Sequence, residues 1–503
     1  MRLRFLPDVA APLCGLLMGL TAAGVAPAAP LDAAAPPGAM VGLPPASTAT
    51  LPPSVAAALA RAGVPRDAFV AMVQEVGRST PRLAWRMDQP ANPASMMKLL
   101  TTYAGLDLLG PAWTWSTPVW LQGRVHDGVL DGNLVIKGSG DPKLVLERLW
   151  LLLRRVRQLG VDEIRGDIVL DDSAFTVPAQ NAADFDGEAL RPYNVGADAL
   201  MLNFKALVFT FTPDAARGIA TIGVDPPLAG VRVDASVPLT SGGCDDWRGG
   251  LRADFSDALH PRFAGGLPVT CSEKVWPVAY ADAARYDERA IAGLWQAVGG
   301  KLAGSVHGGL APSTAPSFAV TSPTLAELVH DTNKYSNNVM AQQLFLTLAL
   351  TQRGSGTPEV AREVLRQWAV ERFGAAATSG LVIDNGSGLS RDTRVSARLL
   401  TQLLESAWAG PVMSELMSSL PVSGVDGTLK KSRATLGRAH LKTGSLRDVA
   451  GIAGYVLANS GRRYVVVAIV NHDNANAARP ALDALVQWAA SDGAPPPDSP
   501  QTP

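Results

Sequence analysis

Residues 113–321 differ from the rest of the chain in their pattern of expected helices and strands. Helical and buried-strand patterns come before and after this stretch, whereas the stretch itself has short β segments, many glycines and one strongly helical segment at 145–159. One hydrophobic core rarely organises 503 residues, so two or three domains are expected. The sequence therefore predicts an α/β (α+β) domain, formed by residues 54–112 and 322–490, that is split by a β-rich insertion.

The first 28 residues have the features of an export signal. Arg2 and Arg4 precede an apolar segment rich in small residues at 10–25, and Ala-Pro-Ala at 26–28 offers a small-x-small cleavage site. The apolar run is short for a membrane span and contains Pro12. The sequence predicts cleavage, export to the periplasm and no transmembrane anchor in the mature protein. An uncleaved N-terminal anchor is the alternative.

Composition separates the packed chain from its ends. Residues 29–53 are rich in Ala and Pro and are expected to be a flexible lead-in, and residues 491–503 form a Pro-, Ser- and Asp-rich tail that we expect to be disordered. The whole chain has 47% hydrophobic and 18% charged residues, a globular balance. Its formal net charge of −1 gives no electrostatic footprint for nucleic acid.

The predicted export determines which cysteines remain in the mature protein and whether they are expected to form a disulfide. Cys14 would be removed with the signal, which leaves Cys244 and Cys271. Two cysteines in an oxidising compartment favour one disulfide, with two free buried thiols as the alternative. The six histidines are scattered, and neither His-Glu-x-x-His nor Cys-x-x-Cys occurs, so no metal site and no cofactor are predicted.

The first candidate chemical motif is Ser-Met-Met-Lys at 95–98. It lies near the start of an expected helix, which Asn92 would cap and Pro93 would open, and whose side chains are apolar nearly all round. Ser95 and Lys98 are three residues apart and share one helix face. Burial lowers the pKa of a lysine, so Lys98 is a candidate base for Ser95. The alternative is a lysine that snorkels out of a core helix.

The second motif is Ser-Asn-Asn at 336–338, inside a helical pattern. A hydroxyl and a carboxamide there can relay a proton and bind a substrate amide. A polar helix start is the simpler interpretation of these three residues taken alone.

The third motif is Lys-Thr-Gly at 442–444, followed by Ser445 and then by the final β hairpin. A strand that carries an ammonium and a hydroxyl suits a substrate carboxylate, and a glycine beside them allows a close backbone approach. An exposed lysine at a strand edge is the alternative.

The order Ser-x-x-Lys, Ser-x-Asn, Lys-Thr-Gly resembles the class C low-molecular-mass penicillin-binding proteins, the D-alanyl-D-alanine carboxypeptidase/endopeptidases. The similarity covers most of residues 52–488, and three further segments match, at 138–142, 384–391 and 420–429. The long spacing from Lys98 to Ser336 is also typical of that family. Gln342 departs from the family, which often has Glu there, and residues 206–267 are the least recognisable part.

The resemblance implies a fold, an activity and a set of roles. The fold would be a penicillin-binding, serine β-lactamase-like transpeptidase domain with a large insertion of two nested domains. The activity would be hydrolysis of D-Ala-D-Ala ends and cross-links of peptidoglycan through an acyl-enzyme, with β-lactams as inhibitors. The implied catalytic residues are Ser95 as nucleophile, Lys98 as its base and Ser336 as proton relay. The implied substrate-binding residues are Asn338, Lys442, Thr443, Gly444 and Ser445.

Three alternatives share these motifs. A class A β-lactamase needs a Glu-x-x-x-Asn loop between the second and third motifs, and no glutamate in that interval has Asn four residues on. A penicillin-recognising sensor without turnover needs a transmembrane partner region, and none is recognisable in the sequence. A structural wall-binding protein with a degenerate site conflicts with the intact trio. The sequence therefore favours the peptidase.

Overall fold

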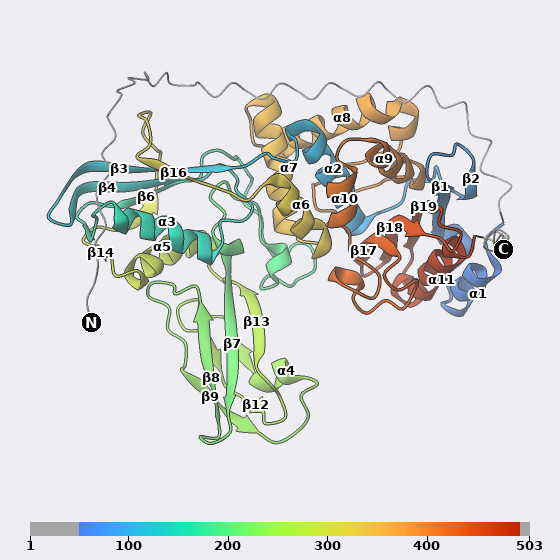
Figure 1. The fold of residues 1–503 in the computed structure, drawn as a ribbon. Helices are drawn as coiled ribbons and strands as arrows, with labels where there is room; N and C mark the ends of the chain where they lie inside the picture. Colours follow the sequence, from blue (N-terminus) through green and yellow to red (C-terminus); the bar gives the residue numbers. More distant parts are fainter. Residues whose placement is uncertain (1–49, 493–503) are drawn as a thin grey trace, which may run out of the picture. The chain divides into compact units, whose positions relative to one another are not determined.

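The computed structural model describes residues 50–492, and an antiparallel five-stranded sheet joins the two halves of the predicted split domain (Figure 1). The strand order is β17-β18-β19-β1-β2, so strands from opposite ends of the chain are neighbours. In β1 and β19, the register runs from Phe69 opposite Val470 to Glu75 opposite Tyr464. The strands are β1 (Phe69–Glu75), β2 (Pro81–Trp85), β17 (Ala439–Leu446), β18 (Val449–Leu457) and β19 (Arg463–Asn471).

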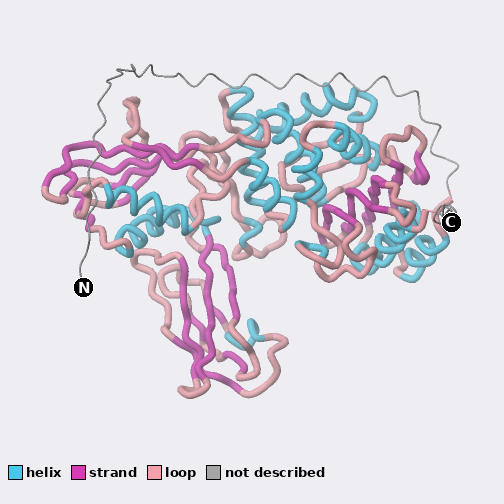
Figure 2. The backbone as a smooth tube through the Cα atoms, viewed as in Figure 1, coloured by secondary structure: helices cyan, strands magenta, loops and turns pink. Residues whose placement is uncertain are grey.

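Helices cover both faces of this sheet, as the helix and strand colours of Figure 2 show. On one face, α1 (Pro53–Arg61) packs with α11 (Arg479–Ala490), and both contribute to one apolar cluster with the strands. The other face contacts the larger helical cluster. Because both faces are covered, residues 464–470 of β19 are all buried, which explains their unbroken apolar sequence.

The larger cluster is built around α2 (Met97–Leu109). Every residue from Met97 to Leu106 is buried, as expected for a helix that is apolar all round. Lys98 is therefore enclosed with its neighbours rather than extended to solvent. The other helices of this cluster are α6 (Leu325–Lys334), α7 (Asn338–Arg353), α8 (Pro358–Thr378), α9 (Ala397–Ala409) and α10 (Met413–Ser419).

The insertion contains two main sheets. The first is a seven-stranded mixed sheet whose long β3–β4 hairpin turns at Asp127 and Gly128, both with positive φ, as a type I′ turn requires. It is packed by α3 (Leu146–Gln158) and α5 (Tyr286–Ala297). Its strands are β3 (Ser116–His126), β4 (Val129–Lys137), β5 (Glu163–Ile164), β6 (Ile168–Asp171), β14 (Lys301–Leu302), β15 (Val306–Gly308) and β16 (Phe318–Thr321).

The second sheet of the insertion has the order β12-β9-β8-β7-β13. Aromatic side chains fill one face of it, with Phe209, Phe211 and Phe263 in edge-to-face contact. Its strands are β7 (Ala206–Asp214), β8 (Ile219–Asp225), β9 (Ser236–Thr240), β12 (Leu267–Pro268) and β13 (Lys274–Ala279). A separate two-stranded sheet, β10–β11 (Ala253–Asp254, Arg262–Phe263), and α4 (Trp247–Leu251) contribute to the same apolar cluster. The division of the insertion into two nested domains stays a prediction.

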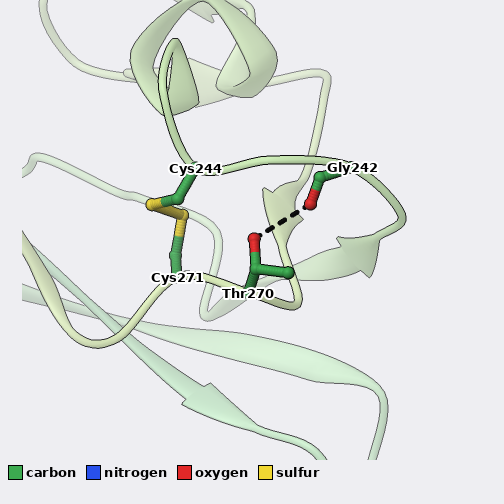
Figure 3. The surroundings of a disulfide bond; sticks show 4 residues. All are labelled: Gly242, Cys244, Thr270 and Cys271. Atoms are coloured by element: carbon green, nitrogen blue, oxygen red, sulfur yellow. Dashed lines mark hydrogen bonds between the residues drawn. A yellow bond between two sulfur atoms is a disulfide. The ribbon is translucent and has the colours of Figure 1, made fainter.

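Cys244 and Cys271 form the predicted disulfide, with 5.2 Å between their Cα atoms (Figure 3). It ties the loop before α4 to the segment after β12. Beside it, the hydroxyl of Thr270 donates to the carbonyl of Gly242 at 2.9 Å. The alternative of two free buried thiols is therefore excluded.

Removing the disulfide should affect stability more than chemistry. The two cysteines are 27 positions apart, and closing such a loop stabilises the fold by about 3 kcal/mol in the chain-entropy model. A Cys244→Ala/Cys271→Ala variant should melt at a lower temperature in calorimetry. Its acylation rate with penicillin should stay close to the wild-type rate, because the bond lies in the insertion. A large loss of acylation rate in the folded variant would contradict the claim that the disulfide affects stability more than chemistry.

The ends of the described region shift two predicted boundaries. Leu51 is already buried, so packing begins inside the predicted lead-in. Ser491 and Asp492 were assigned to the tail, but Arg462 donates to the Asp492 carboxylate at 2.9 Å and holds this residue on the sheet. The predicted signal at 1–28, Cys14 and most of the lead-in and tail lie outside the described residues. Within residues 50–492, no helix is long and apolar enough to cross a membrane.

Candidate active site

Ser95 lies in a 3₁₀ turn, Ala94–Met96, that directly precedes α2. The expectation that Asn92 and Pro93 open the α-helix itself is wrong by one turn. Asn92 instead fixes the approach to Ser95, because its side-chain oxygen accepts from the Ala94 N–H at 2.9 Å. Its backbone N–H donates to the side chain of Asn471 at the end of β19, at 2.7 Å. These bonds anchor the turn that carries the hydroxyl to the central sheet.

The Lys98 amine points at Ser95 from inside the protein. Its Nζ lies 3.0 Å from the Ser95 Oγ. The same Nζ is 2.7 Å from the Asn338 Oδ1 and 2.7 Å from the Ser387 carbonyl oxygen. Burial, and then the positive charge of Lys442, lower the pKa of Lys98 well below its ordinary value. A buried amine with these contacts is suited to accept the proton of Ser95, and the interpretation of a snorkelling lysine is wrong.

Ser336 occupies a loop between α6 and α7, not the interior of one helix. Its backbone is left-handed, with φ at +57°, a conformation that costs a non-glycine residue about 1 kcal/mol or more. Asn337 then caps α7, since its side-chain oxygen accepts from the Met340 N–H at 3.0 Å. The polar helix start considered for this motif is therefore present. In the same motif, the Ser336 hydroxyl contacts Lys442 of the third motif.

Lys442 on β17 connects the second and third motifs. Its Nζ donates to the Ser336 Oγ at 2.9 Å and to the Thr443 carbonyl at 2.9 Å. Its side chain is fully buried, and burial lowers the pKa of Lys442 to about 7. The structure thus brings both lysines and both serines of the predicted trio together. An exposed lysine at a strand edge does not describe Lys442.

A contact within the chain itself explains why position 444 is a glycine. A Cβ at this position would lie 2.4 Å from the carbonyl oxygen of Pro93, just before the turn that carries Ser95. Sequence reasoning attributed this glycine to the approach of a substrate backbone, whereas its first effect is to let β17 pack against the Ser95 turn. Its role in substrate binding stays a prediction.

Thr443 and Ser445 are placed differently. The Thr443 hydroxyl lies 2.8 Å from the hydroxyl of Thr428, which belongs to the matching segment 420–429. Two hydroxyls side by side near Lys442 can bind a carboxylate. Ser445 is exposed, and its Oγ accepts from the Arg479 guanidinium at 2.8 Å. That contact leaves the role predicted for the Ser445 N–H untested.

Several groups at the site were not predicted by residue. The carbonyl of Ser387 and that of Tyr193 carry no side-chain signal, yet they contact Lys98 and Asn338. Lys334 is buried and donates to the Leu420 carbonyl at 2.7 Å, which ties the Ser336 loop to segment 420–429. The matching segments 384–391 and 420–429 were the available signal for Ser387 and Leu420, whereas Tyr193 and Lys334 lie outside them.

Gln342 occupies the position where this kind of penicillin-binding protein often has Glu, and its partner is a neutral group. Its side-chain oxygen accepts from the Gly386 N–H at 3.0 Å. The residue therefore helps to hold the loop whose Ser387 carbonyl contacts Lys98, and it needs no charged partner to do so.

A cavity of about 320 Å³ opens beside Asn338. One wall comes from the insertion and includes Phe185 and Tyr193. The other wall comes from α7, α8 and the loop after Asp384, and it includes Gln342 and Arg362. The insertion therefore helps to form the surroundings of the site. The described residues contain no group of three or more His, Cys, Asp or Glu side chains that would hold a metal ion.

Comparison with known families gives a match over nearly all of the described residues. The model of the D-Ala-D-Ala carboxypeptidase 3 (S13) family matches residues 51–492. The chain belongs to this family. The predicted family and the prediction of a carboxypeptidase enzyme are thereby confirmed.

Individual relatives of the carboxypeptidase family agree with this assignment. The chain is 29% identical to a D-alanyl-D-alanine carboxypeptidase of Actinomadura sp., over 77% of this chain and 74% of the relative. It is 25% identical to the D-alanyl-D-alanine carboxypeptidase DacB of Haemophilus influenzae, over 75% of this chain and 80% of the relative.

Solved structures show the fold. Penicillin-binding protein 4 of Haemophilus influenzae superposes with a TM-score of 0.66 at 21% identity, over 84% of this chain and 94% of that chain. The same protein has also been solved in complex with a β-lactam. The predicted penicillin-binding fold is confirmed.

Proposed function

We propose that this family member is a serine D,D-peptidase of the periplasm that removes terminal D-Ala from peptidoglycan stem peptides and also cleaves D-Ala cross-links. The observation that carries the proposal is the Lys98 amine, fully buried and 3.0 Å from the Ser95 Oγ. A lysine of lowered pKa at this distance can take the proton of the serine hydroxyl and so activate it as a nucleophile.

The proposed reaction uses the groups in a fixed order. Ser95 Oγ attacks the carbonyl carbon of the penultimate D-Ala while neutral Lys98 takes the hydroxyl proton. The backbone N–H groups of Ser95 and Ser445 stabilise the oxyanion. The C–N bond then breaks as Ser336 relays the proton taken up by Lys98 to the leaving nitrogen. Water then hydrolyses the acyl-enzyme and frees Ser95. β-Lactams form the same ester with Ser95.

Thr443 and Lys442 are proposed to bind the free carboxylate next to the scissile bond. A charge-assisted hydrogen bond of this kind contributes about 1.5–3 kcal/mol. Thr443→Ala should therefore cut turnover of D-Ala-D-Ala peptides about 10- to 100-fold. The measurement is kcat/KM with the peptide acid and with its C-terminal amide.

The amide is the matched control for this assignment. It lacks the carboxylate, so the wild type should cleave it poorly, and Thr443→Ala should lose little more. Equal cleavage of acid and amide by the wild type would rule out the carboxylate role of Thr443, although not the nucleophile. A sensor protein would give stable acylation by penicillin and no product from either peptide.

The two lysines predict the pH dependence of the reaction. Lys98 must be neutral to act as a base, so kcat/KM should rise with pH through its lowered pKa. Lys442 must be charged to attract a carboxylate, and its pKa is about 7. Acid peptides should therefore lose kcat/KM as the pH rises above about 7, whereas the amide should not. A profile for the acid peptide that keeps rising to pH 9 would contradict the role given to Lys442.

A further inference from the structure

The side chain of Asn338 joins the site to the insertion. Its Oδ1 lies 2.7 Å from the Lys98 Nζ, and its Nδ2 donates to the Tyr193 carbonyl at 3.1 Å. Tyr193 belongs to a 3₁₀ turn of the insertion, Pro192–Asn194. The two ends of this carboxamide therefore contact elements that are far apart in the sequence.

The orientation of the Asn338 carboxamide decides whether Lys98 can act as a base. A neutral amine has two N–H donors and one lone pair. The Asn338 Oδ1 and the Ser387 carbonyl, each at 2.7 Å, are acceptors and take both donors. The lone pair is then left for the Ser95 hydroxyl at 3.0 Å. A carboxamide turned the other way would present N–H to that lone pair and compete with Ser95.

The Tyr193 carbonyl determines this orientation, because a carbonyl only accepts and thus selects the Nδ2 end. The turn that holds it is organised by Asp186. The Asp186 carboxylate accepts from the Tyr193 hydroxyl at 2.8 Å, from the Asn194 Nδ2 at 2.8 Å and from the Glu188 N–H at 3.0 Å. The slight desolvation of this exposed carboxylate opposes the charge, but these hydrogen bonds prevail and lower the pKa of Asp186. Asp186 therefore remains an acceptor at neutral pH.

We propose that Asp186 is a positioning residue for the peptidase reaction. It holds the Tyr193 carbonyl so that the Asn338 carboxamide keeps its oxygen toward Lys98, which leaves the Lys98 lone pair free for Ser95. This inference rests on the proposed roles of Lys98 and Ser95. It gives the insertion a part in the chemistry, through a residue that itself touches no reacting atom.

The test compares Asp186→Ala with Glu188→Gln in the full chain. Both side chains are exposed and both changes remove one negative charge from the same loop. Glu188→Gln keeps the backbone N–H and carbonyl that contact Asp186 and Asn194. Stopped-flow acylation by a small fluorescent penicillin, at varied concentration, separates the dissociation constant from the acylation rate constant. A small β-lactam makes the readout independent of peptide side-chain subsites.

Asp186→Ala should lower the acylation rate constant about tenfold, the effect of one hydrogen bond, with an unchanged dissociation constant. In a pH profile of the acylation rate constant, the fall toward acid pH should lie at a lower pH in Asp186→Ala than in the wild type. The reason is that Lys98 loses the Asn338 Oδ1 as an acceptor, which disfavours the ammonium form of Lys98. Glu188→Gln should match the wild type in both respects.

Three results would overturn the positioning role of Asp186. These are a wild-type rate constant in Asp186→Ala, an equal loss in both variants, and a fall toward acid pH that does not move. The proposed function fails in a different way, since the wild type itself would then not be acylated at Ser95.

Discussion

Replacing Ser95 by Ala should abolish both covalent labelling by a fluorescent penicillin and turnover of D-Ala-D-Ala peptides. The Ser95 Oγ is the hydroxyl that lies 3.0 Å from the buried Lys98 amine, and no bond to the substrate acyl group forms without it. The fold should persist, because the variant loses one atom from a half-buried position. Gel fluorescence and circular dichroism measure the two properties.

Ser414→Ala is a matched control for the loss of a hydroxyl. Ser414 lies on α10, and its hydroxyl contacts only the neighbouring Glu415 in the described chain. This variant should label and turn over like the wild type. Persistent labelling of Ser95→Ala at the wild-type rate would show that another residue is the nucleophile.

Lys98→Ala should slow acylation by about 10²- to 10⁴-fold, the contribution of a positioned general base. The amine is held by the Asn338 Oδ1 and the Ser387 carbonyl 3.0 Å from the Ser95 Oγ, so the substitution removes a positioned base. The measurement is the acylation rate constant with penicillin, determined by stopped flow. The dissociation constant should change much less.

Lys98→Met separates chemistry from packing. Lys98 is fully buried, and Ala would leave a cavity there, whereas Met nearly fills the same volume. Both variants should be equally slow if the amine is the base. A fast Lys98→Met variant would mean that the defect of Lys98→Ala comes from packing alone.

The parts of the site that follow from local geometry could be predicted from sequence. Ser95 and Lys98 are three residues apart on a helical segment, so their proximity needs no tertiary information. The uniform apolar character of α2 also indicated that Lys98 would be buried. The roles of the third motif and the disulfide needed more, namely the family resemblance and the assumption of export.

Other features depend on contacts that leave no mark in a single sequence. The apolar pattern runs on across Ser336, so it hid the left-handed break between α6 and α7. Backbone carbonyls such as those of Ser387 and Tyr193 have the same chemistry in every residue, and only the fold selects them. The part that the insertion plays beside Asn338 arises in the same way, through tertiary contact.

Digestion of purified peptidoglycan, with the products identified by mass spectrometry, tests the central claim most directly. The wild type should release D-Ala from stem-peptide ends and should convert cross-linked dimers to monomers, and penicillin should block both reactions. Ser95→Ala should leave both kinds of peptide intact. Unchanged peptidoglycan after incubation with folded, penicillin-labelled wild type, or equal digestion by Ser95→Ala, would contradict the assignment of a serine D,D-peptidase.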